Sequence, residues 1–237
     1  MPPLLSLLIS TLETRRRSFD ELFQELHRQI AASGFQQSVE VLFDRDQGER
    51  PVGQKRNELV ARASGAFVAF IDDDDAVSPE YVQRVCTALV RHPEVDCLGI
   101  VGEITFPGGL ARHFVHSVRY DRYFSRRGRY YRPPFHFNPV RREIACCYPF
   151  EPIRYGEDVD WALRLARARV LRTEEFLPDV LYHYRCRRSW HYQRLLDLTE
   201  PIRHPLHLTH ANLVAAKRQV RRLARFGRSP VSNTKTA

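Results

Sequence analysis

The chain has 237 residues, 43% of them hydrophobic, and carries 37 Lys and Arg against 28 Asp and Glu. This length and composition suit one large globular domain or two intimate halves, and they exclude a disordered or fibrous chain. The net charge of +9 favours anionic partners, a class that includes nucleic acid, nucleotide phosphates and an anionic membrane face.

The sequence also bears on location. No apolar stretch approaches the roughly 20 residues of a membrane span, and residues 1–10 lack the basic start and small-residue cleavage site of a signal peptide. None of the five cysteines forms a C-x-x-C pair, which favours reduced thiols. We therefore expect a cytoplasmic protein.

The first half of the chain alternates between apolar runs and helical patterns. Four apolar runs have the length of buried strands, over residues 4–10, 39–43, 66–71 and 95–106. Helical patterns lie between them, from Ser18 to a stop at Gly34, over 54–64, and from Ser78 onward. Ser18 and Glu21 form a capping-box pattern, and Ser78 is the expected cap of the third helix. This order predicts an α/β sandwich with a mainly parallel sheet.

The second half has a weaker pattern. Residues 110–155 are rich in Arg, Tyr, Phe, Pro and His and show no clean period, after a predicted turn at 107–109. A helix is predicted over Glu157–Ala168 and a strand over Val180–Tyr184, followed by a basic, helical C-terminus. No repeat or low-complexity linker separates the parts, which favours a single domain with two halves.

Four aspartates, Asp72–Asp75, directly follow a buried apolar run. This position is the carboxyl end of a predicted parallel strand, where open α/β sheets bind ligands. Adjacent carboxylates repel one another, so the cluster indicates either full solvation or a hard cation such as Mg²⁺ or Mn²⁺ shared with substrate phosphates. The alternative is an acidic loop that caps the helix near Ser78.

Three other stretches carry candidate chemistry. The basic helix start at Gly53–Asn57 suits a diphosphate, although such a start is commonly solvated surface. Glu157 and Asp158 lie in the first turn of a helix, where the macrodipole favours carboxylates, and either can accept a proton from an incoming hydroxyl. His183 lies on a strand, as a structural residue or as a contact to metal or diphosphate.

Together, these motifs resemble the family 2 glycosyltransferases of GT-A fold. The likeness spans roughly residues 4–190 and rests on three segments in a fixed order: Gly53–Asp75 with its Arg56-Asn57 pair, Asn138–Arg142, and Gly156-Glu157-Asp158 with Trp161 and Arg164. The resemblance implies a GT-A-like, Rossmann-like α/β/α sandwich. We expect one catalytic domain over 1–210, with a nucleotide-sugar half to about 106 and an acceptor half after it, followed by a basic segment over 211–237.

The resemblance further implies an inverting transfer from a nucleotide-diphosphate sugar to an acceptor hydroxyl, with Mn²⁺ or Mg²⁺ as cofactor. The acceptor would be a glycan or a lipid-linked molecule, in polysaccharide, lipopolysaccharide or other glycoconjugate synthesis. In the Asp-x-Asp pattern of the family, Asp74 is the expected direct metal ligand and Asp72 lies near ribose and metal, but Asp73 and Asp75 form an equally good pair. Asp158 is the expected general base.

The remaining expected site residues come from the stretches described above and from this resemblance. Residues 44–48 follow the family's acidic turn only loosely. His183 is expected at the metal, and Glu157 is expected to be catalytic together with Asp158. The expected donor contacts are Asp44, Lys55, Arg56, Asn57, Asp72 and Asp73.

Two rival functions use the same features. A sugar-nucleotide nucleotidyltransferase would carry a Gly-rich basic loop after the first strand, whereas residues 11–17 contain no Gly. A nucleic-acid-binding protein would explain the charge and the aromatics among the arginines of 113–137, but the aspartate run repels phosphates and no recognised binding motif occurs. We expect no nucleic-acid partner.

The C-terminal tail suggests a membrane contact. Residues 217–226 form a basic helical pattern with Val220, Leu223 and Phe226 at three-residue spacing. Such a helix can lie on the anionic inner face of a membrane as a peripheral anchor, or it can be a solvated surface helix.

Overall fold

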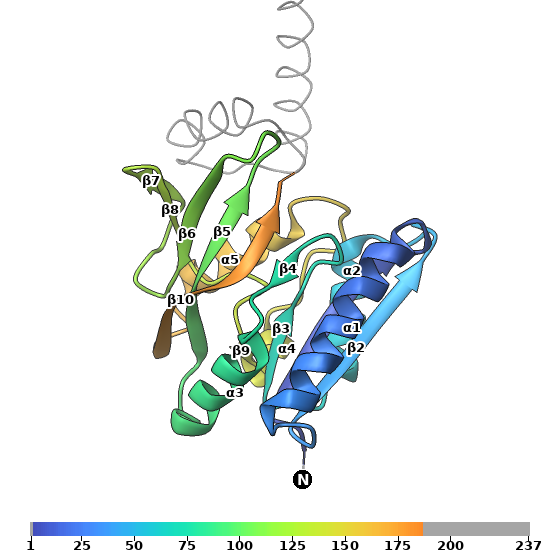
Figure 1. Cartoon of the computed structure of the whole chain (residues 1–237). Helices are drawn as coiled ribbons and strands as arrows, with labels where there is room; N and C mark the ends of the chain where they lie inside the picture. Colours follow the sequence, from blue (N-terminus) through green and yellow to red (C-terminus); the bar gives the residue numbers. More distant parts are fainter. Residues whose placement is uncertain (1, 187–237) are drawn as a thin grey trace, which may run out of the picture. The chain divides into compact units, whose positions relative to one another are not determined.

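The apolar run near the start of the chain forms β1 (Leu5–Leu12), an interior strand of a ten-stranded sheet in the computed structural model, which describes residues 2–186 (Figure 1). β2 (Val39–Asp46) and β3 (Phe67–Phe70) lie on either side of β1 and run parallel to it. Both faces of β1 are covered, which explains why most of its residues are apolar.

Helices cover the two faces of this sheet, and each face has its own core. α1 (Arg16–Ser33) and α3 (Tyr81–Arg91) pack on one face with Leu5, Leu7 and Ile9 of β1. The other face carries α2 (Val52–Arg62), α4 (Arg142–Cys147) and α5 (Glu157–Ala168), with Leu8 of β1 in their core. Because successive side chains of a strand point to opposite faces, one strand contributes to both cores. The predicted α/β/α sandwich with a mainly parallel central sheet is confirmed.

The strand order brings distant parts of the chain together at one edge. The main path is β2-β1-β3-β9-β5-β6-β8-β7, and β10 pairs with β5 and with β4. β1, β2, β3, β5 and β10 share one direction, so their carboxyl ends meet at the same edge of the sheet. We call this the carboxyl edge. The remaining strands are β4 (Ala76–Val77), β5 (Cys97–Thr105), β6 (Ala111–His116), β7 (Phe124–Arg126), β8 (Arg129–Arg132), β9 (Val140–Arg141) and β10 (Glu174–Arg185).

Two predicted helix caps are wrong. α1 begins at Arg16, after a 3-10 turn over Glu13–Arg15, so the Ser18 capping box does not form. α3 begins at Tyr81 rather than at Ser78, and no side chain of its N-cap residue closes it. Instead, the side chain of Gln29 in α1 accepts a hydrogen bond from the backbone N–H of Val82 at 3.1 Å. A helix end can therefore be satisfied from a neighbouring helix, which local sequence patterns do not reveal.

Several other expectations agree with the structure. α5 has the predicted bounds, and α1 ends at Gly34 in the left-handed conformation with φ of 78°. The region 110–155, where the sequence shows no period, contains the short elements β6 to β9 and α4. These strands have two to six residues, which is too short for an alternating pattern to stand out.

Some expectations fall on residues that the structure does not describe. These are the domain boundary at residue 210, the basic segment 211–237 and its membrane contact. Within residues 2–186, no helix combines the length and the apolar character required to cross a bilayer. All five cysteines lie in this part of the chain and are free thiols.

Gly53 lies in the first turn of α2, where that helix meets the loop before α5. A Cβ at this position would lie 1.9 Å from the carbonyl oxygen of Glu151, a backbone atom. Gly53→Ala would ordinarily favour a helix by up to about 1 kcal/mol. Here we expect the overlap to dominate and the variant to lose about 1–3 kcal/mol of unfolding free energy. Urea unfolding measures this, with Gln54→Ala in the same turn as the control. Equal stability of the two variants would contradict this packing.

Candidate active site at the carboxyl edge

The four aspartates divide into two pairs with different surroundings. The side chains of Asp72 and Asp74 retain 32% and 22% exposure, whereas that of Asp73 retains 1% and Asp75 is also buried. Asp73 accepts hydrogen bonds from Thr11 Oγ1 at 2.6 Å and from an Arg15 guanidinium nitrogen at 2.7 Å. Residues 72–75, which we call the acidic loop, are therefore fixed to the end of β1 through Asp73. Asp72 and Asp74 stay partly exposed, and Asp74 also pairs with Arg15 at 3.3 Å.

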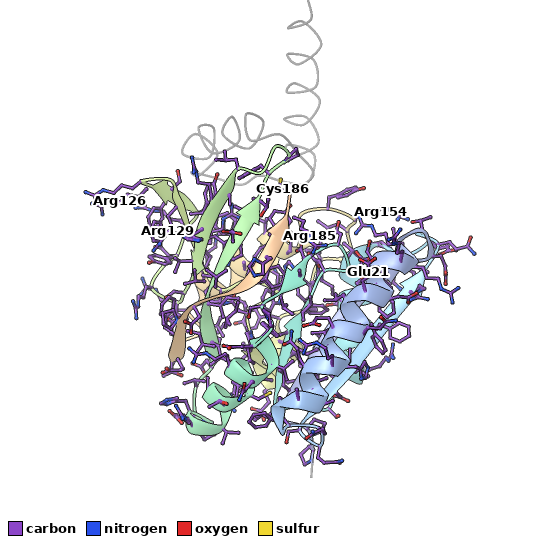
Figure 2. The ribbon with its side chains drawn as sticks, in the orientation of Figure 1. Glu21, Arg126, Arg129, Arg154, Arg185 and Cys186 are labelled. Atoms are coloured by element: carbon purple, nitrogen blue, oxygen red, sulfur yellow. The ribbon has the colours of Figure 1, made fainter. Side chains whose placement is uncertain are left out.

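Asp75 is held from the other side by β10. It accepts hydrogen bonds from the Tyr182 hydroxyl at 2.8 Å and from the backbone N–H of Arg185 at 2.9 Å, near the end of the described chain (Figure 2). Burial, together with the negative charge of Asp72, raises the pKa of Asp75 well above its ordinary value. The Tyr182 hydroxyl also accepts a hydrogen bond from the backbone N–H of Asp72 at 3.2 Å. β10 thus fixes both ends of the acidic loop.

Asp72 lies between two basic side chains, those of Arg56 and His136. Burial alone would raise its pKa, but the charges of His136 and Arg56 outweigh this effect and hold the pKa well below its ordinary value. Arg56 Nη2 donates to Asp72 Oδ1 at 3.0 Å, and His136 Nε2 lies 3.2 Å from Asp72 Oδ2. Asp72 is therefore a carboxylate held ionised by two neighbours.

Arg56 joins the two halves of the site. Its guanidinium contacts Asp72 on one side and Glu157 Oε1, at 3.3 Å, on the other. It also stacks over the ring of Phe70, with 4.7 Å from Cζ to the ring centre. Burial alone would lower its pKa, but the two carboxylates outweigh burial and raise it. A buried charge of this kind is stable only while its partners are present.

His136 is a second link between the halves. Its side chain is 2% exposed, with Nε2 on Asp72 and Nδ1 at 3.9 Å from Asp158 Oδ2. Nδ1 has no hydrogen-bond partner within residues 2–186, although it is buried. The residue lies between β8 and β9, in the region without a sequence period. Sequence reasoning missed it, and only its place shortly before Asn138–Arg142 could have pointed to it.

Glu157 and Asp158 begin α5 but face different surroundings. Glu157 is buried against Arg56, and burial, with the adjacent charge of Asp158, raises its pKa. Asp158 retains 27% side-chain exposure, and its Oδ1 accepts a hydrogen bond from the backbone N–H of Val159 at 2.7 Å. Of these two carboxylates, Asp158 is the one that an incoming molecule can reach.

The other expected donor contacts are engaged within the protein. Arg50 binds Asp44 with both terminal nitrogens, at 2.8 and 2.5 Å. Lys55 is buried and donates to Asp46 Oδ1 at 2.8 Å and to the carbonyl of Thr11.

Asn57 faces the backbone. Its side-chain amide donates to the carbonyl of Phe150 at 2.8 Å, and its oxygen accepts from the N–H of Phe150 at 2.7 Å. This reciprocal pair fixes the loop that leads to α5. The structure therefore brings Asp72, Arg56, Glu157, His136 and Asp158 together. The side chains of Asp44, Lys55 and Asn57 instead bond to Arg50, Asp46 and Phe150.

His183 lies on β10, opposite Ala76 of β4. Its Nδ1 is 3.9 Å from Glu103 Oε1, and its side chain is 36% exposed. It is thus next to the acidic loop in the sheet, but its contact is with β5 and not with an aspartate of the loop. The prediction that His183 binds metal remains untested.

The residues present fit a cation shared with a substrate better than a closed metal cage. Among residues 2–186, no group of three or more His, Cys, Asp or Glu side chains is arranged to hold a metal. Asp72 and Asp74 offer carboxylate oxygens on the open side of the loop. Mg²⁺ in particular is commonly bound by one or two carboxylates together with substrate phosphates and water. Asp72 and Asp74 are the partly exposed carboxylates of the loop that could meet this requirement, beside their contacts with Arg56, His136 and Arg15.

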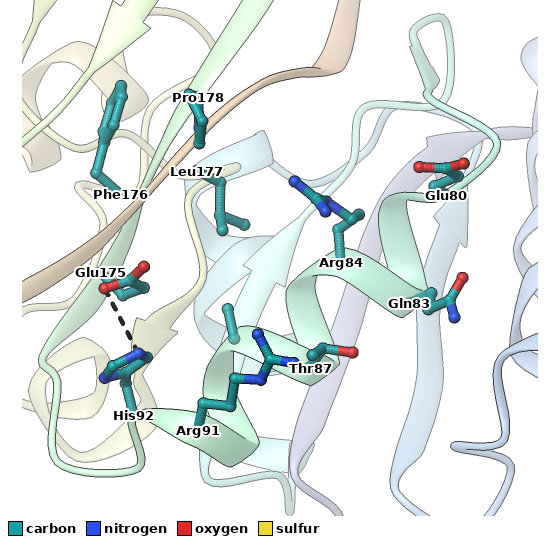
Figure 3. A pocket seen from close by; sticks show the side chains of 11 residues that line it. Glu80, Gln83, Arg84, Thr87, Arg91, His92, Glu175, Phe176, Leu177 and Pro178 are labelled. Carbon is teal, nitrogen blue, oxygen red and sulfur yellow. Dashed lines mark ion pairs between the residues drawn. The ribbon is translucent and has the colours of Figure 1, made fainter.

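A separate pocket of about 440 Å³ lies between α3 and the start of β10 (Figure 3). Arg84, Thr87 and Arg91 of α3 face Glu175–Pro178 of β10, and His92 forms an ion pair with Glu175 at 3.7 Å. None of the residues expected to bind donor, metal or acceptor lines it. Its lining carries no cluster suited to transfer chemistry, so the carboxyl edge is the candidate site.

One known protein family matches about half of the chain. The model of the family described as "Glycosyl transferase family 2" matches residues 25–147, just over half of the chain. The matched range includes the acidic loop, Arg56 and His136, and ends before Glu157 and Asp158.

Solved structures of TarS from S. aureus share the fold. TarS 1–349 has a TM-score of 0.52 at 14% identity, over 76% of this chain and 60% of that chain. TarS 1–349 in complex with UDP-GlcNAc has a TM-score of 0.52 at 14% identity, over 80% of this chain and 60% of that chain. A longer TarS structure gives 0.51 at 14% identity, over 77% of this chain and 36% of that one. This chain therefore spans less than two thirds of these proteins, and the likeness at this identity concerns the fold alone.

Proposed function

Since the chain belongs to glycosyl transferase family 2, we propose that it transfers a sugar from a nucleotide-diphosphate sugar to an acceptor hydroxyl, with inversion and with a divalent cation at Asp72 and Asp74. One observation carries the proposal, which is that two side chains link the acidic loop to the start of α5. Arg56 contacts both Asp72 and Glu157. His136 lies between Asp72 and Asp158. The carboxylate proposed to bind the donor and the carboxylate proposed as the base thus belong to one cluster.

Asp158 acts as the general base in this proposal. The acceptor hydroxyl gives its proton to the Asp158 carboxylate while its oxygen bonds to the anomeric carbon of the donor sugar. The bond from that carbon to the diphosphate oxygen breaks, and its electron pair leaves with the nucleoside diphosphate. A single displacement inverts the anomeric centre through an oxocarbenium-like state. Glu157 is ill suited to be the base because it is buried and paired with Arg56.

Exposure supports the choice of cation ligands. Asp72 and Asp74 are partly exposed, while Asp73 and Asp75 are buried and hold the loop to β1 and β10, which supports the Asp72 and Asp74 register. A bound Mg²⁺ or Mn²⁺ would supply positive charge for the leaving diphosphate. Arg56, Lys55 and Asn57 are assigned positioning roles in this scheme, since the side chain of each bonds to another part of the site.

Donor binding is the direct test of this function. We expect a nucleoside diphosphate to raise the melting temperature in Mn²⁺ and to lose that effect in EDTA. Uridine diphosphate is the first to try, because a similarly folded protein was solved in complex with UDP-GlcNAc. Asp74→Asn should lose the Mn²⁺-dependent shift. Asp160→Asn is the matched control, since Asp160 pairs with Arg164 on the outer part of α5. No response to any nucleoside diphosphate would refute the proposal.

His136 is assigned a positioning role between the donor and the base. We expect His136→Ala to lower kcat by up to about a hundredfold, because the donor carboxylate and the base lose their common neighbour. The KM for the donor should rise much less. His136→Gln keeps a donor group for Asp72 and should recover part of kcat. An unchanged kcat in His136→Ala, or no difference between the two variants, would remove this role.

A further inference from the structure

The segment 107–155 has an unusual charge. It contains ten arginines and three acidic residues, whereas residues 1–106 contain eleven Lys and Arg and seventeen Asp and Glu. Residues 107–155 therefore have a positive net charge, whereas residues 1–106 have a negative one. Excess positive charge on one side of a site raises the local concentration of anionic molecules.

Part of this charge lies on the hairpin of β7 and β8. The hairpin turns at Arg127 and Gly128, whose φ angles are 52° and 73°, and its tip is exposed. Arg126 and Arg129 are paired directly opposite each other across the turn. Figure 2 shows both side chains extending away from the ribbon. Like charges directly opposite each other on paired strands are unfavourable. None of Arg126, Arg127 and Arg129 forms an ion pair with a carboxylate within residues 2–186. An anion would relieve this repulsion.

The same hairpin carries an aromatic surface. Phe124 is 38% exposed and stacks on Tyr131, with ring centres 5.0 Å apart and planes inclined by 15°. Tyr120 meets the edges of both rings, at 5.5 and 5.3 Å. Flat aromatic faces beside guanidinium groups suit a partner with both apolar ring faces and negative charges.

The hairpin tip lies on the carboxyl edge, in line with the acidic loop. In the sheet register, Ala76 pairs with His183, His183 with Glu103, and Glu103 with His113. Arg129 directly precedes Tyr130, which pairs with Phe114, the residue after His113. Four strand spacings thus separate the acidic loop from Arg129, or about 20 Å. The side chains of His183, Glu103 and His113 form a polar row between them, with contacts of 3.9 and 3.7 Å.

We propose that the β7–β8 hairpin and this polar row bind the distal part of an acceptor glycan chain that carries phosphate groups. This inference rests on the proposed glycosyltransferase function and adds the chemical class of the acceptor. The end of the chain receives the sugar at Asp158, and the phosphates further along contact Arg126 and Arg129. Guanidinium groups match phosphate geometry, and the aromatic rings pack against the sugar faces.

Binding of a defined probe tests this assignment. The probes are fluorescently labelled dextran phosphate and unmodified dextran of the same length, titrated with the full chain at several salt concentrations. We expect only dextran phosphate to bind, and Arg126→Gln with Arg129→Gln to weaken binding roughly tenfold and lower the salt slope by about two. The control variant is Arg62→Gln with Arg91→Gln, exposed arginines at the ends of α2 and α3, near the opposite edge. This control variant should change the affinity for dextran phosphate little. Every variant keeps the basic C-terminal segment, so that segment cannot cause a difference between them.

Other outcomes overturn the proposal. Equal losses in the hairpin and control variants would show attraction by net charge alone. Binding to phosphatidylglycerol vesicles but not to dextran phosphate, lost in the hairpin variant, would make the surface a lipid contact. The Mn²⁺-dependent shift with uridine diphosphate is measured on the same proteins. If the protein shows this shift but the hairpin variant binds dextran phosphate as well as the unchanged chain does, only the proposed acceptor class is disproved. A chain without a response to any nucleoside diphosphate disproves the transferase function itself.

Discussion

Asp158→Asn is expected to lower the rate of sugar transfer by about 10²–10⁴-fold while donor binding persists. The carboxamide has nearly the same shape as the carboxylate but cannot accept the acceptor proton. Asp158 is the accessible carboxylate at the start of α5, and the donor-side contacts of Asp72 with Arg56 and His136 do not involve it. Turnover of a uridine diphosphate sugar, with the Mn²⁺-dependent thermal shift on the same sample, measures both quantities.

Two variants in the same helix turn separate a base from a merely nearby charge. Asp160→Asn removes a carboxylate that pairs with Arg164 at 2.7 Å, and it should leave transfer nearly unchanged. Glu157→Gln removes a partner of Arg56 and should lower stability as well as transfer. If Asp158→Asn kept full transfer while Glu157→Gln lost it without a loss of stability, the base would be Glu157.

The organisation of the site follows from where its parts attach. The acidic loop is held by β1 through Asp73 and by β10 through Asp75, so its position depends on two strands that are far apart in sequence. The start of α5 is held by Asn57 through Phe150 and by the close approach at Gly53. α2 therefore positions the start of α5, while its Arg56 contacts the acidic loop.

The strands and the acidic loop were predictable because their signals are local. An apolar run followed by four aspartates specifies a buried strand and a polar carboxyl end whatever the rest of the chain does. The register within Asp72–Asp75 was not predictable, since it depends on Thr11, Arg15, Tyr182 and Arg185, which lie about 60 to 110 residues away. Local spacing has no information on such contacts.

His136 and the basic start of α2 show a second limit. His136 lies in a stretch where strands are too short to produce a period, so its position against Asp72 emerges only from the sheet. Lys55 and Asn57 read as surface or ligand-binding groups in the sequence, but the structure bonds them to Asp46 and to the backbone of Phe150. A polar residue near a site can hold the site together without touching the substrate, and sequence type alone does not separate these roles.

Arg56→Met is expected to be the most destabilising change in the site, at about 3–5 kcal/mol of unfolding free energy. The variant keeps the packing volume beside Phe70 but leaves Asp72 and Glu157 without their shared cation. Urea unfolding measures the loss, and transfer should fall with it because the donor and base sides are no longer connected. Arg56→Lys should recover little, since one ammonium cannot reproduce the planar contacts to both carboxylates.

A second substitution distinguishes loss of charge from loss of packing. Adding Glu157→Gln to Arg56→Met removes one of the two unpaired carboxylates, so the double variant should be more stable than Arg56→Met alone. Transfer should stay low in the double variant, because Asp72 still lacks its guanidinium. If the two losses simply added, Arg56 would act by packing against Phe70 and Phe150, and the ionic link between the donor and base sides would have to be abandoned.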